Sequence, residues 1–419
     1  NAQWPATWDS TSHQSDYPVA ITVDAQGNVI TVGKSKAISE DFITIKYDRL
    51  GTLMWTKRYN GPDNGQDTAN DVITDADGNV YVTGQAYAAA TAGDMFIIKY
   101  DANGAPQWQR RVSSSPFNGE YGLSIALRSD RVAVTGLTFD NETSFDVETV
   151  MLDTAGNVKW KKTLSGQGDR YANGASVAFG PDGSLYVGAN IGYDATGMDM
   201  ALIKYSAAGA KQWVRHWDGG DNKNDGVDSI RVAPDGTIVV AGTAMSKNSN
   251  SDYAALKFDS DGNRLWVTKT DFATDQLTAM NLDSDGNLYL TGYTSTGGFS
   301  TNDYYTVKLS GDGVKQWAKR YSALDSGSST DVAVGVDVDN AGNVYVAGWS
   351  QSAMGDYGIT TVKYGTDGSL KNVDATGEGD GINQMGVAMA IDKTRNRAFI
   401  AGYTADAAFQ PLDFLTIRS

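Results

Sequence analysis

The sequence contains no cysteine, only 8 prolines and only two histidines, His13 and His216. The lack of cysteine excludes a disulfide framework, a thiolate metal site and a cysteine nucleophile. Two histidines are too few for a metal centre built from imidazole ligands.

Positive charge is also scarce, since 34 Lys and Arg face 50 Asp and Glu and give a formal net charge of −16. Nucleic-acid binding needs clustered basic residues, so no nucleic-acid partner is expected. No apolar run approaches the ~20 residues that span a bilayer. The chain starts at Asn1 without an initiator methionine, as a chain trimmed of its signal peptide does. We expect a secreted or cell-surface protein, and a periplasmic location also fits.

Glycine, by contrast, is abundant, and much of it recurs in one phrase. "DAQGNVITVG" at 24–33 returns as "DADGNVYVTG" at 75–84, "DSDGNLYLTG" at 283–292 and "DNAGNVYVAG" at 339–348. The last glycine of the phrase falls at Gly33, Gly84, Gly136, Gly188, Gly242, Gly292, Gly348 and Gly402. Seven steps from Gly33 to Gly402 average about 53 residues, a period typical of propeller-type repeats.

Each repeat predicts four short strands separated by turns. In the second repeat these are 67–74, 79–86, 94–100 and 106–112, with Asp-Gly and Asn-Gly pairs between them. Such pairs supply the positive φ that tight hairpins need, and no segment has a helical pattern. We therefore predict an all-β fold, an eight-bladed β-propeller of four-stranded antiparallel blades.

The two ends of the sequence complement each other. "NAQWPATWD" at 1–9 aligns with "AKQWVRHWD" at 210–218, which is a fourth strand, whereas "LDFLTIRS" at 412–419 is a third strand without a fourth. We predict that residues 2–8 pair with 412–418, complete blade 8 and close a single domain over 1–419. Pairing of this kind leaves no open sheet edge.

The run "DFITIKYDRLGTLMW" at 41–55, together with "DADGNVYVTG" at 75–84, resembles the bacterial SBBP β-propeller repeat family. That resemblance implies a propeller that is exported or surface-associated. The turn-plus-tryptophan element is also similar, more weakly, to eight-bladed quinoprotein propellers, which implies that indoles dock blade to blade. The residues predicted to dock in this way are Trp4, Trp55, Trp108, Trp160, Trp213, Trp266 and Trp317. Asn372 stands where blade 7 should carry its tryptophan, so a looser junction is expected there.

Two periodic acidic series point to the end of the blades where the loops vary in length. The first opens the third strands, at Asp41, Asp94, Asp146, Asp199, Asp252, Asp303, Asp356 and Asp413. The second opens the first strands, and its candidates for Ca²⁺ binding are Asp16, Asp67, Asp225, Asp275 and Asp331, with Glu120 and Asp169 in the same phase. A ring of carboxylates could attract cations, because Ca²⁺ prefers oxygen ligands. Their strict periodicity favours the alternative that they accept backbone N–H groups and hold the scaffold.

No Ser/His/Asp constellation, phosphate-binding loop or zinc motif is present, so a non-catalytic role is favoured. The leading hypothesis is an exported module that binds a protein or glycan partner through its variable loops. A second is a structural subunit that exchanges terminal strands with other copies into a homo-oligomer. A third is a quinoprotein-like or polysaccharide-acting enzyme that uses the carboxylates. No cofactor is expected, and Ca²⁺ is left open.

Overall fold

The structure is a computed structural model of the chain. It describes residues 4–10, 12–113, 119–139, 145–168, 170–247, 250–270, 272–295, 302–324, 329–377, 381–406 and 412–419. Within them the chain folds into eight four-stranded antiparallel sheets and no helix. The predicted all-β propeller of eight four-stranded blades is thereby confirmed. No helix in the described residues is long and apolar enough to cross a membrane.

The chain divides into two compact units, Asn1–Arg58 with Asp271–Ser419, and Tyr59–Thr270. In the first unit blade 1 comprises β2 (Asp16–Val23), β3 (Val29–Lys36), β4 (Glu40–Tyr47) and β5 (Leu53–Tyr59). Blade 6 comprises β22 (Thr274–Leu282), β23 (Leu288–Ser295), β24 (Asn302–Leu309) and β25 (Lys315–Tyr321). Blade 7 comprises β26 (Asp331–Val338), β27 (Val344–Gln351), β28 (Tyr357–Tyr364) and β29 (Leu370–Ala375). Blade 8 comprises β30 (Asn383–Asp392), β31 (Arg397–Ala405), β32 (Leu412–Arg418) and β1 (Ala6–Trp8).

The second unit contains blades 2 to 5. Blade 2 comprises β6 (Thr68–Thr74), β7 (Val80–Ala88), β8 (Ala92–Tyr100) and β9 (Pro106–Val112). Blade 3 comprises β10 (Glu120–Arg128), β11 (Arg131–Phe139), β12 (Phe145–Asp153) and β13 (Val158–Leu164). Blade 4 comprises β14 (Ala172–Phe179), β15 (Leu185–Tyr193), β16 (Gly197–Tyr205) and β17 (Lys211–Trp217). Blade 5 comprises β18 (Asp225–Val232), β19 (Ile238–Met245), β20 (Ser251–Phe258) and β21 (Arg264–Thr270).

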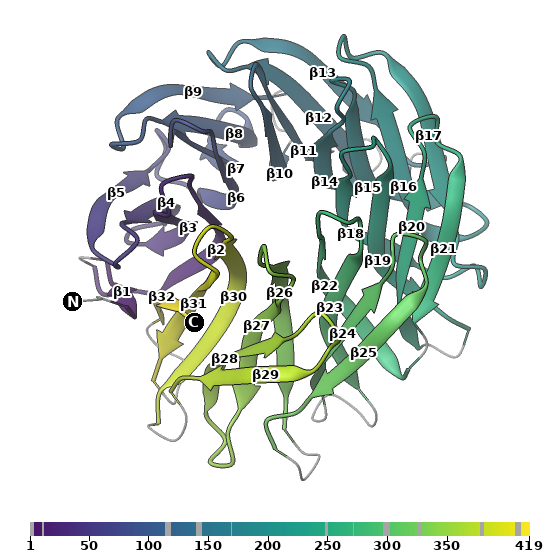
Figure 1. Cartoon of the computed structure of the whole chain (residues 1–419). Coiled ribbons are helices and arrows are strands. Elements are labelled where there is room, and N and C mark those ends of the chain that lie inside the picture. Colours follow the sequence, from purple (N-terminus) through teal and green to yellow (C-terminus); the bar gives the residue numbers. More distant parts are fainter. Residues whose placement is uncertain are drawn as a thin grey trace. The chain divides into compact units, whose positions relative to one another are not determined.

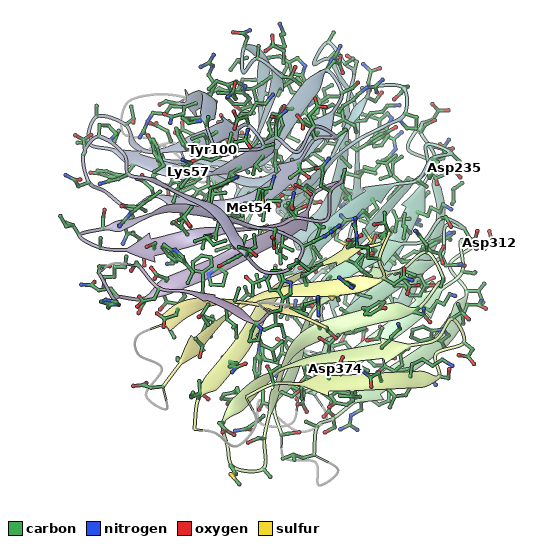
Figure 2. All side chains as sticks on the ribbon, turned by 60° about the vertical axis from the view of Figure 1, so that its left-hand side comes forward. Met54, Lys57, Tyr100, Asp235, Asp312 and Asp374 are labelled. Atoms are coloured by element: carbon green, nitrogen blue, oxygen red, sulfur yellow. The ribbon has the colours of Figure 1, made fainter. Side chains whose placement is uncertain are left out.

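In blades 1 to 7 the turns between strands 1 and 2 and between strands 3 and 4 lie at one end, which we call the turn end, and blade 8 has only the first of these turns. The connections between strands 2 and 3, and from strand 4 to the next blade, lie at the other, the loop end. Turns such as those carrying Asp235 and Asp312, both labelled in Figure 2, are short and closed by backbone hydrogen bonds. Asp75 shows how the repeated phrase makes them, because its Oδ1 accepts the N–H groups of Asp77 and Asn79 at 3.1 and 2.9 Å. Gly78 then supplies the required positive φ of 81°.

The final glycine of the phrase is needed for a different reason. Each first strand carries a bulge opposite this glycine, for example between Gly122 and Ser124 opposite Gly136. A Cβ on Gly136 would lie 1.8 Å from the carbonyl oxygen of Tyr121, and a Cβ on Gly348 would lie 1.9 Å from that of Val332. Only glycine fits where the bulged strand brings its backbone so close.

The second and third strands form the core of each blade. β7 shows the pattern, since Val80 and Val82 are fully buried and Tyr81 is nearly so. The fourth strands are half-exposed, and Met54 on β5 (Figure 2) is 47% exposed. β7 and β8 extend beyond the predicted strands to Ala88 and from Ala92, because alanines expected in the loop continue the ladder.

The predicted pairing of the chain's two ends is confirmed. β1 lies beside β32 (Figure 1), with Ala6 opposite Thr416 and Trp8 opposite Phe414. Of the predicted strand 2–8, residues 2 and 3 lie outside the described residues, and Trp4 and Pro5 precede β1, which begins at Ala6. The Trp4 ring contacts Phe399 of blade 8 at 5.3 Å and Tyr47 of blade 1 at 5.7 Å between ring centroids. β1 therefore joins blade 8 to blade 1 inside one unit.

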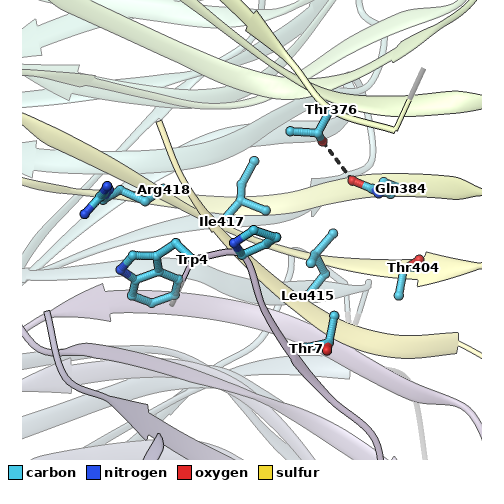
Figure 3. A pocket seen from close by; sticks show the side chains of 9 residues that line it. Trp4, Thr7, Thr376, Gln384, Thr404, Leu415, Ile417 and Arg418 are labelled. Atoms are coloured by element: carbon cyan, nitrogen blue, oxygen red, sulfur yellow. Dashed lines mark hydrogen bonds between the residues drawn. The ribbon is translucent and has the colours of Figure 1, made fainter. Parts of the chain in front are cut away.

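The junction between blades 7 and 8 differs from its neighbours. Asn372 makes a hydrogen bond to Asp374 instead of reaching blade 8. β32 is not followed by a turn into β1, because β1 precedes β2 in the sequence, so no turn is in place to receive an indole. A cavity of about 270 Å³ lies nearby, lined by Trp4, Leu415 and Ile417 and by Thr376 and Gln384, which share a hydrogen bond (Figure 3).

Candidate functional site

The predicted docking tryptophans lie on fourth strands or, for Trp4, just before one. Trp108 on β9 donates from Nε1 to the carbonyl oxygen of Thr154 at 2.9 Å, and Trp160 on β13 donates to that of Ala207 at 3.3 Å. Trp317 on β25 does the same to Thr366 at 3.1 Å. Each acceptor lies in the turn between strands 3 and 4 of the following blade. Trp55, Trp213 and Trp266 lie on the equivalent strands β5, β17 and β21.

The acidic series of the third strands lies at the loop end. Asp41, Asp94 and Asp303 are each 2% exposed. Each contacts an arginine from the fourth strand of its own blade: Arg58 with Asp41 at 2.7 Å, Arg111 with Asp94 at 2.8 Å, and Arg320 with Asp303. In blade 4 a histidine takes this place, and His216 Nε2 lies 2.9 Å from Asp199 Oδ2. Asp146 is buried, whereas Asp252, Asp356 and Asp413 are half-buried.

Several members of the acidic series of the first strands accept N–H groups of the adjoining loops. Asp67 accepts the N–H groups of Gly61 and Tyr87 with its two oxygens, at 2.5 and 2.8 Å. Asp225 accepts those of Gly219 and Met245 in the same way. The remaining Ca²⁺ candidates Asp16, Asp275 and Asp331 are 0% exposed, Glu120 is equally buried, and Asp169 lies outside the described residues.

Burial changes the acidity of several of these groups. It raises the pKa of Asp225 to about 6, against the opposing effect of the two N–H donors. It also raises the pKa of Asp16 and of Asp331. Loss of hydration disfavours the charged form, so these carboxylates are held at an energetic cost.

Members of the two series come together with a third carboxylate in two places. Asp9, Asp16 and Asp413 form one cluster in the first unit, and Asp199, Asp218 and Asp225 form another in the second. In each cluster one carboxylate oxygen from each residue lies within 4.8 Å of the others. Asp9 and Asp218 belong to neither periodic series, which is why the sequence alone did not single them out.

The loop end also carries exposed apolar side chains that sequence reasoning missed. The sequence feature that could have pointed to these side chains is a single apolar residue within an otherwise polar loop. Those at least 36% exposed at this end are Ile38, Tyr87, Phe139, Tyr171, Phe272, Met354 and Ile382.

Three aromatic residues in the second unit form a continuous patch. Phe139 at the end of β11 packs on Phe145 at 5.2 Å, and Phe145 packs on Tyr171 at 5.3 Å, between ring centroids. Phe139 and Tyr171 remain 38% and 39% exposed. We call these three residues the aromatic patch. It joins blades 3 and 4 at their loop ends.

Comparison with protein families agrees with the geometry. Residues 316–353 match the family described as "Beta-propeller repeat" (SBBP), and residues 233–264 match one described as "Domain of unknown function (DUF5122) beta-propeller". The protein is therefore an all-β propeller. The match over residues 316–353 agrees with the resemblance to the SBBP repeat noted in the sequence.

Two curated proteins are similar in sequence. The regulatory protein FlaEY of Caulobacter vibrioides is 26% identical over 194 residues, which are 37% of this chain and 20% of that protein. An uncharacterized WD repeat-containing protein of Acanthamoeba polyphaga mimivirus is 23% identical over 85% of this chain and 29% of that protein. The chain thus spans less than a third of the length of either relative.

Two solved structures are similar in fold. A quinohemoprotein alcohol dehydrogenase from Pseudomonas putida has a TM-score of 0.57 and 11% identity, covering 99% of this chain and 75% of the enzyme. A protein from Lactobacillus plantarum has a TM-score of 0.52 and 18% identity, covering 83% of this chain and 95% of that one. At these identities the likeness concerns the fold alone.

Proposed function

We propose that the protein is a non-catalytic, exported or cell-surface binding module that holds a protein or glycan partner on the loop ends of its blades. The observation that carries this proposal is the aromatic patch on otherwise polar loops. Aromatic residues exposed side by side and rimmed by polar groups mark interaction sites. A scaffold of short stereotyped turns with variable loops at the opposite end suits such a role.

The contacts that the acidic residues make within the protein also support a binding role. Most of the carboxylates described above accept backbone N–H groups or contact arginines of their own blade. Groups bound in this way hold loops in place. The exposed aromatic rings are therefore better suited to contact a partner than these buried acids.

The experiment is a glycan array together with pull-down from extracellular and cell-envelope fractions, using the intact chain. The variants Phe139→Ser and Tyr171→Ser change the aromatic patch. The matched control is Val158→Ser, which alters a residue of blade 3 that is 47% exposed near the turn end. We expect a ligand that the wild type and Val158→Ser retain and that both patch variants lose at least tenfold in affinity.

The proposal fails if no ligand is retained, or if the patch variants retain it as well as the control does. Turnover of a substrate in an activity screen would also count against it. Fractionation of cells that make the full-length protein tests the extracellular location.

A further inference from the structure

The two carboxylate clusters occupy equivalent places in blades 4 and 8. Asp218 directly follows Trp217 at the end of β17, as Asp9 directly follows Trp8 at the end of β1. Asp225 and Asp16 open the first strand of the next blade, and Asp199 and Asp413 open a third strand. Each cluster thus draws its carboxylates from three separate segments, and each lies inside one unit.

The clusters lack the arginine that balances the same position in three other blades. In blades 1, 2 and 6 an arginine of the fourth strand contacts the third-strand aspartate. In blade 4 that arginine is replaced by His216, and in blade 8 by Thr7. In those same two blades the residue directly after the fourth strand is an aspartate, Asp218 or Asp9. The arginine-bearing blades have Asn60, Ser113 and Ser322 at this place. In blades 4 and 8, loss of the arginine coincides with gain of a carboxylate, whereas blades 3 and 7 have Thr163 and Ala375 at the arginine position and no added carboxylate.

The nearby basic groups bind elsewhere or are imidazoles. Lys269 donates to the carbonyl oxygen of Gly219 and lies over the Trp217 ring. His13 contacts Asp9, and the pKa of His13 is raised by that contact. Among the described residues, no lysine or arginine has an ion pair with a carboxylate of either cluster.

Buried carboxylate oxygens in the clusters have no hydrogen-bond donor. Asp199 is 0% exposed, and while its Oδ2 contacts Thr196 and His216, its Oδ1 has no partner. Asp413 Oδ1 is likewise buried without a partner. A buried acceptor without a donor is destabilising. Asp94 Oδ1 is also without a partner, but there Arg111 balances the charge. For Asp199 and Asp413 no lysine or arginine of the described residues balances the unpartnered oxygen, whereas both oxygens of Asp225 accept backbone N–H groups.

We propose that each cluster binds one divalent cation, with Ca²⁺ as the best fit. The carboxylate and hydroxyl donors are hard oxygens, which Ca²⁺ takes in flexible sets of 6–8, whereas Mg²⁺ demands a near-ideal octahedron. A single imidazole and no thiolate make a poor zinc site. The cation would join blade 4 to blade 5 in one unit and blade 8 to blade 1 in the other. Of the five Ca²⁺ candidates chosen from the sequence, Asp16 and Asp225 belong to these sites.

The test is calcium titration of the intact chain after treatment with a chelator, by calorimetry and by the thermal unfolding midpoint. The variants are Asp218→Asn, Asp9→Asn and the double variant. Asp218 accepts a hydrogen bond from Gly220 N within its own loop, so its variant should fold. The matched control is Asp221→Asn, in the same loop but outside the cluster, where Asp221 faces Lys247.

We expect two Ca²⁺ per chain for the wild type and the control, one for each single variant and none for the double variant. Mg²⁺ should bind at least tenfold more weakly. No Ca²⁺ bound by the wild type, or equal stoichiometry in Asp218→Asn and Asp221→Asn, would overturn the proposal. Circular dichroism confirms that each variant is folded.

A gain-of-charge variant separates a metal site from a merely structural cluster. His216→Arg restores the arginine of the other blades and should fill the space of the cation. We expect it to remove one Ca²⁺ per chain and to raise the unfolding midpoint of the calcium-free protein. Unchanged calcium binding in this variant contradicts the proposed site in blade 4.

Discussion

The indole ring of Trp108 lies directly against Gly156 of the following blade. A Cβ on Gly156 would come 2.6 Å from Cδ2 of the ring. Gly209 stands in the same relation to Trp160, and Gly368 to Trp317. The turn between strands 3 and 4 thus needs glycine twice over, for its positive φ and for the ring beneath it. The indole of one blade therefore packs against the glycine of the next blade, which has no side chain to obstruct the ring.

This relationship predicts the outcome of a comparison between two glycines. Gly156 and Gly236 have the same φ of 82°, but nothing lies within 4 Å of a Cβ on Gly236. Gly236→Ala should cost about 1 kcal/mol of unfolding free energy through backbone strain alone. Gly156→Ala should cost about 1–3 kcal/mol more, because overpacking against the ring is added. Chemical denaturation of both variants measures the difference.

A double-variant cycle provides the control. In a Trp108→Ala background the extra cost of Gly156→Ala should vanish, because the ring is gone. An extra cost that persists without the ring would show that the tryptophan does not dock on this turn.

The buried ion pair of blade 1 predicts a large effect from one lysine. Lys46 Nζ lies 2.9 Å from Asp24 Oδ2, with side chains 1% and 0% exposed. Lys46→Met leaves a buried carboxylate without its cation and should cost about 3–5 kcal/mol. Adding Asp24→Asn should recover most of this, since Asn also closes the turn.

The matched control is Lys34, which pairs with Glu40 at 2.9 Å but is 29% exposed. Lys34→Met should cost less than about 1 kcal/mol, because solvent screens the pair. Equal losses from both lysine variants would contradict this assignment.

Asp71 predicts a pH dependence. Burial raises its pKa to about 6 from 3.8, although its carboxylate accepts the N–H groups of Ile125 and Val72. An acid with a raised pKa in the folded state contributes stability at low pH, and this contribution is lost as the pH rises through about 6.

Relative to Asp71→Asn, the wild type should therefore lose on the order of 2 kcal/mol of unfolding free energy between about pH 4 and about pH 7. Denaturant unfolding of both proteins across this range tests the prediction. Parallel pH profiles for the two proteins would show that Asp71 has no raised pKa.

The fold could be predicted because its signals are periodic. Each Asp-x-x-Gly turn and each glycine opposite a bulge repeats one local requirement, so eight copies identify eight blades. The match of Trp4 and Trp8 to Trp213 and Trp217 also showed which strand completes blade 8. Repetition made these conclusions independent of any single residue.

The candidate sites could not be predicted in the same way, because they depart from the repeat. Asp218 could be recognised as part of a candidate site only from the structure, which places it beside Asp199 and Asp225. The aromatic patch joins residues of two blades whose loops have no common pattern. Next to Asn372, where a tryptophan was expected, blade 8 has no turn between its third and fourth strands, since β32 and β1 are not consecutive in the chain.

The most direct test concerns the pairing of β1 with β32. Ala6 lies opposite Thr416, and opposite residues of antiparallel strands have Cα atoms about 4.5–5.5 Å apart, which a disulfide can bridge. Because the chain has no cysteine, the double variant Ala6→Cys, Thr416→Cys offers a single pairing. Non-reducing electrophoresis after oxidation should show a cross-linked monomer without free thiols. Free thiols in the monomer, or a ladder of disulfide-linked oligomers, would show that the two strands do not pair within one chain.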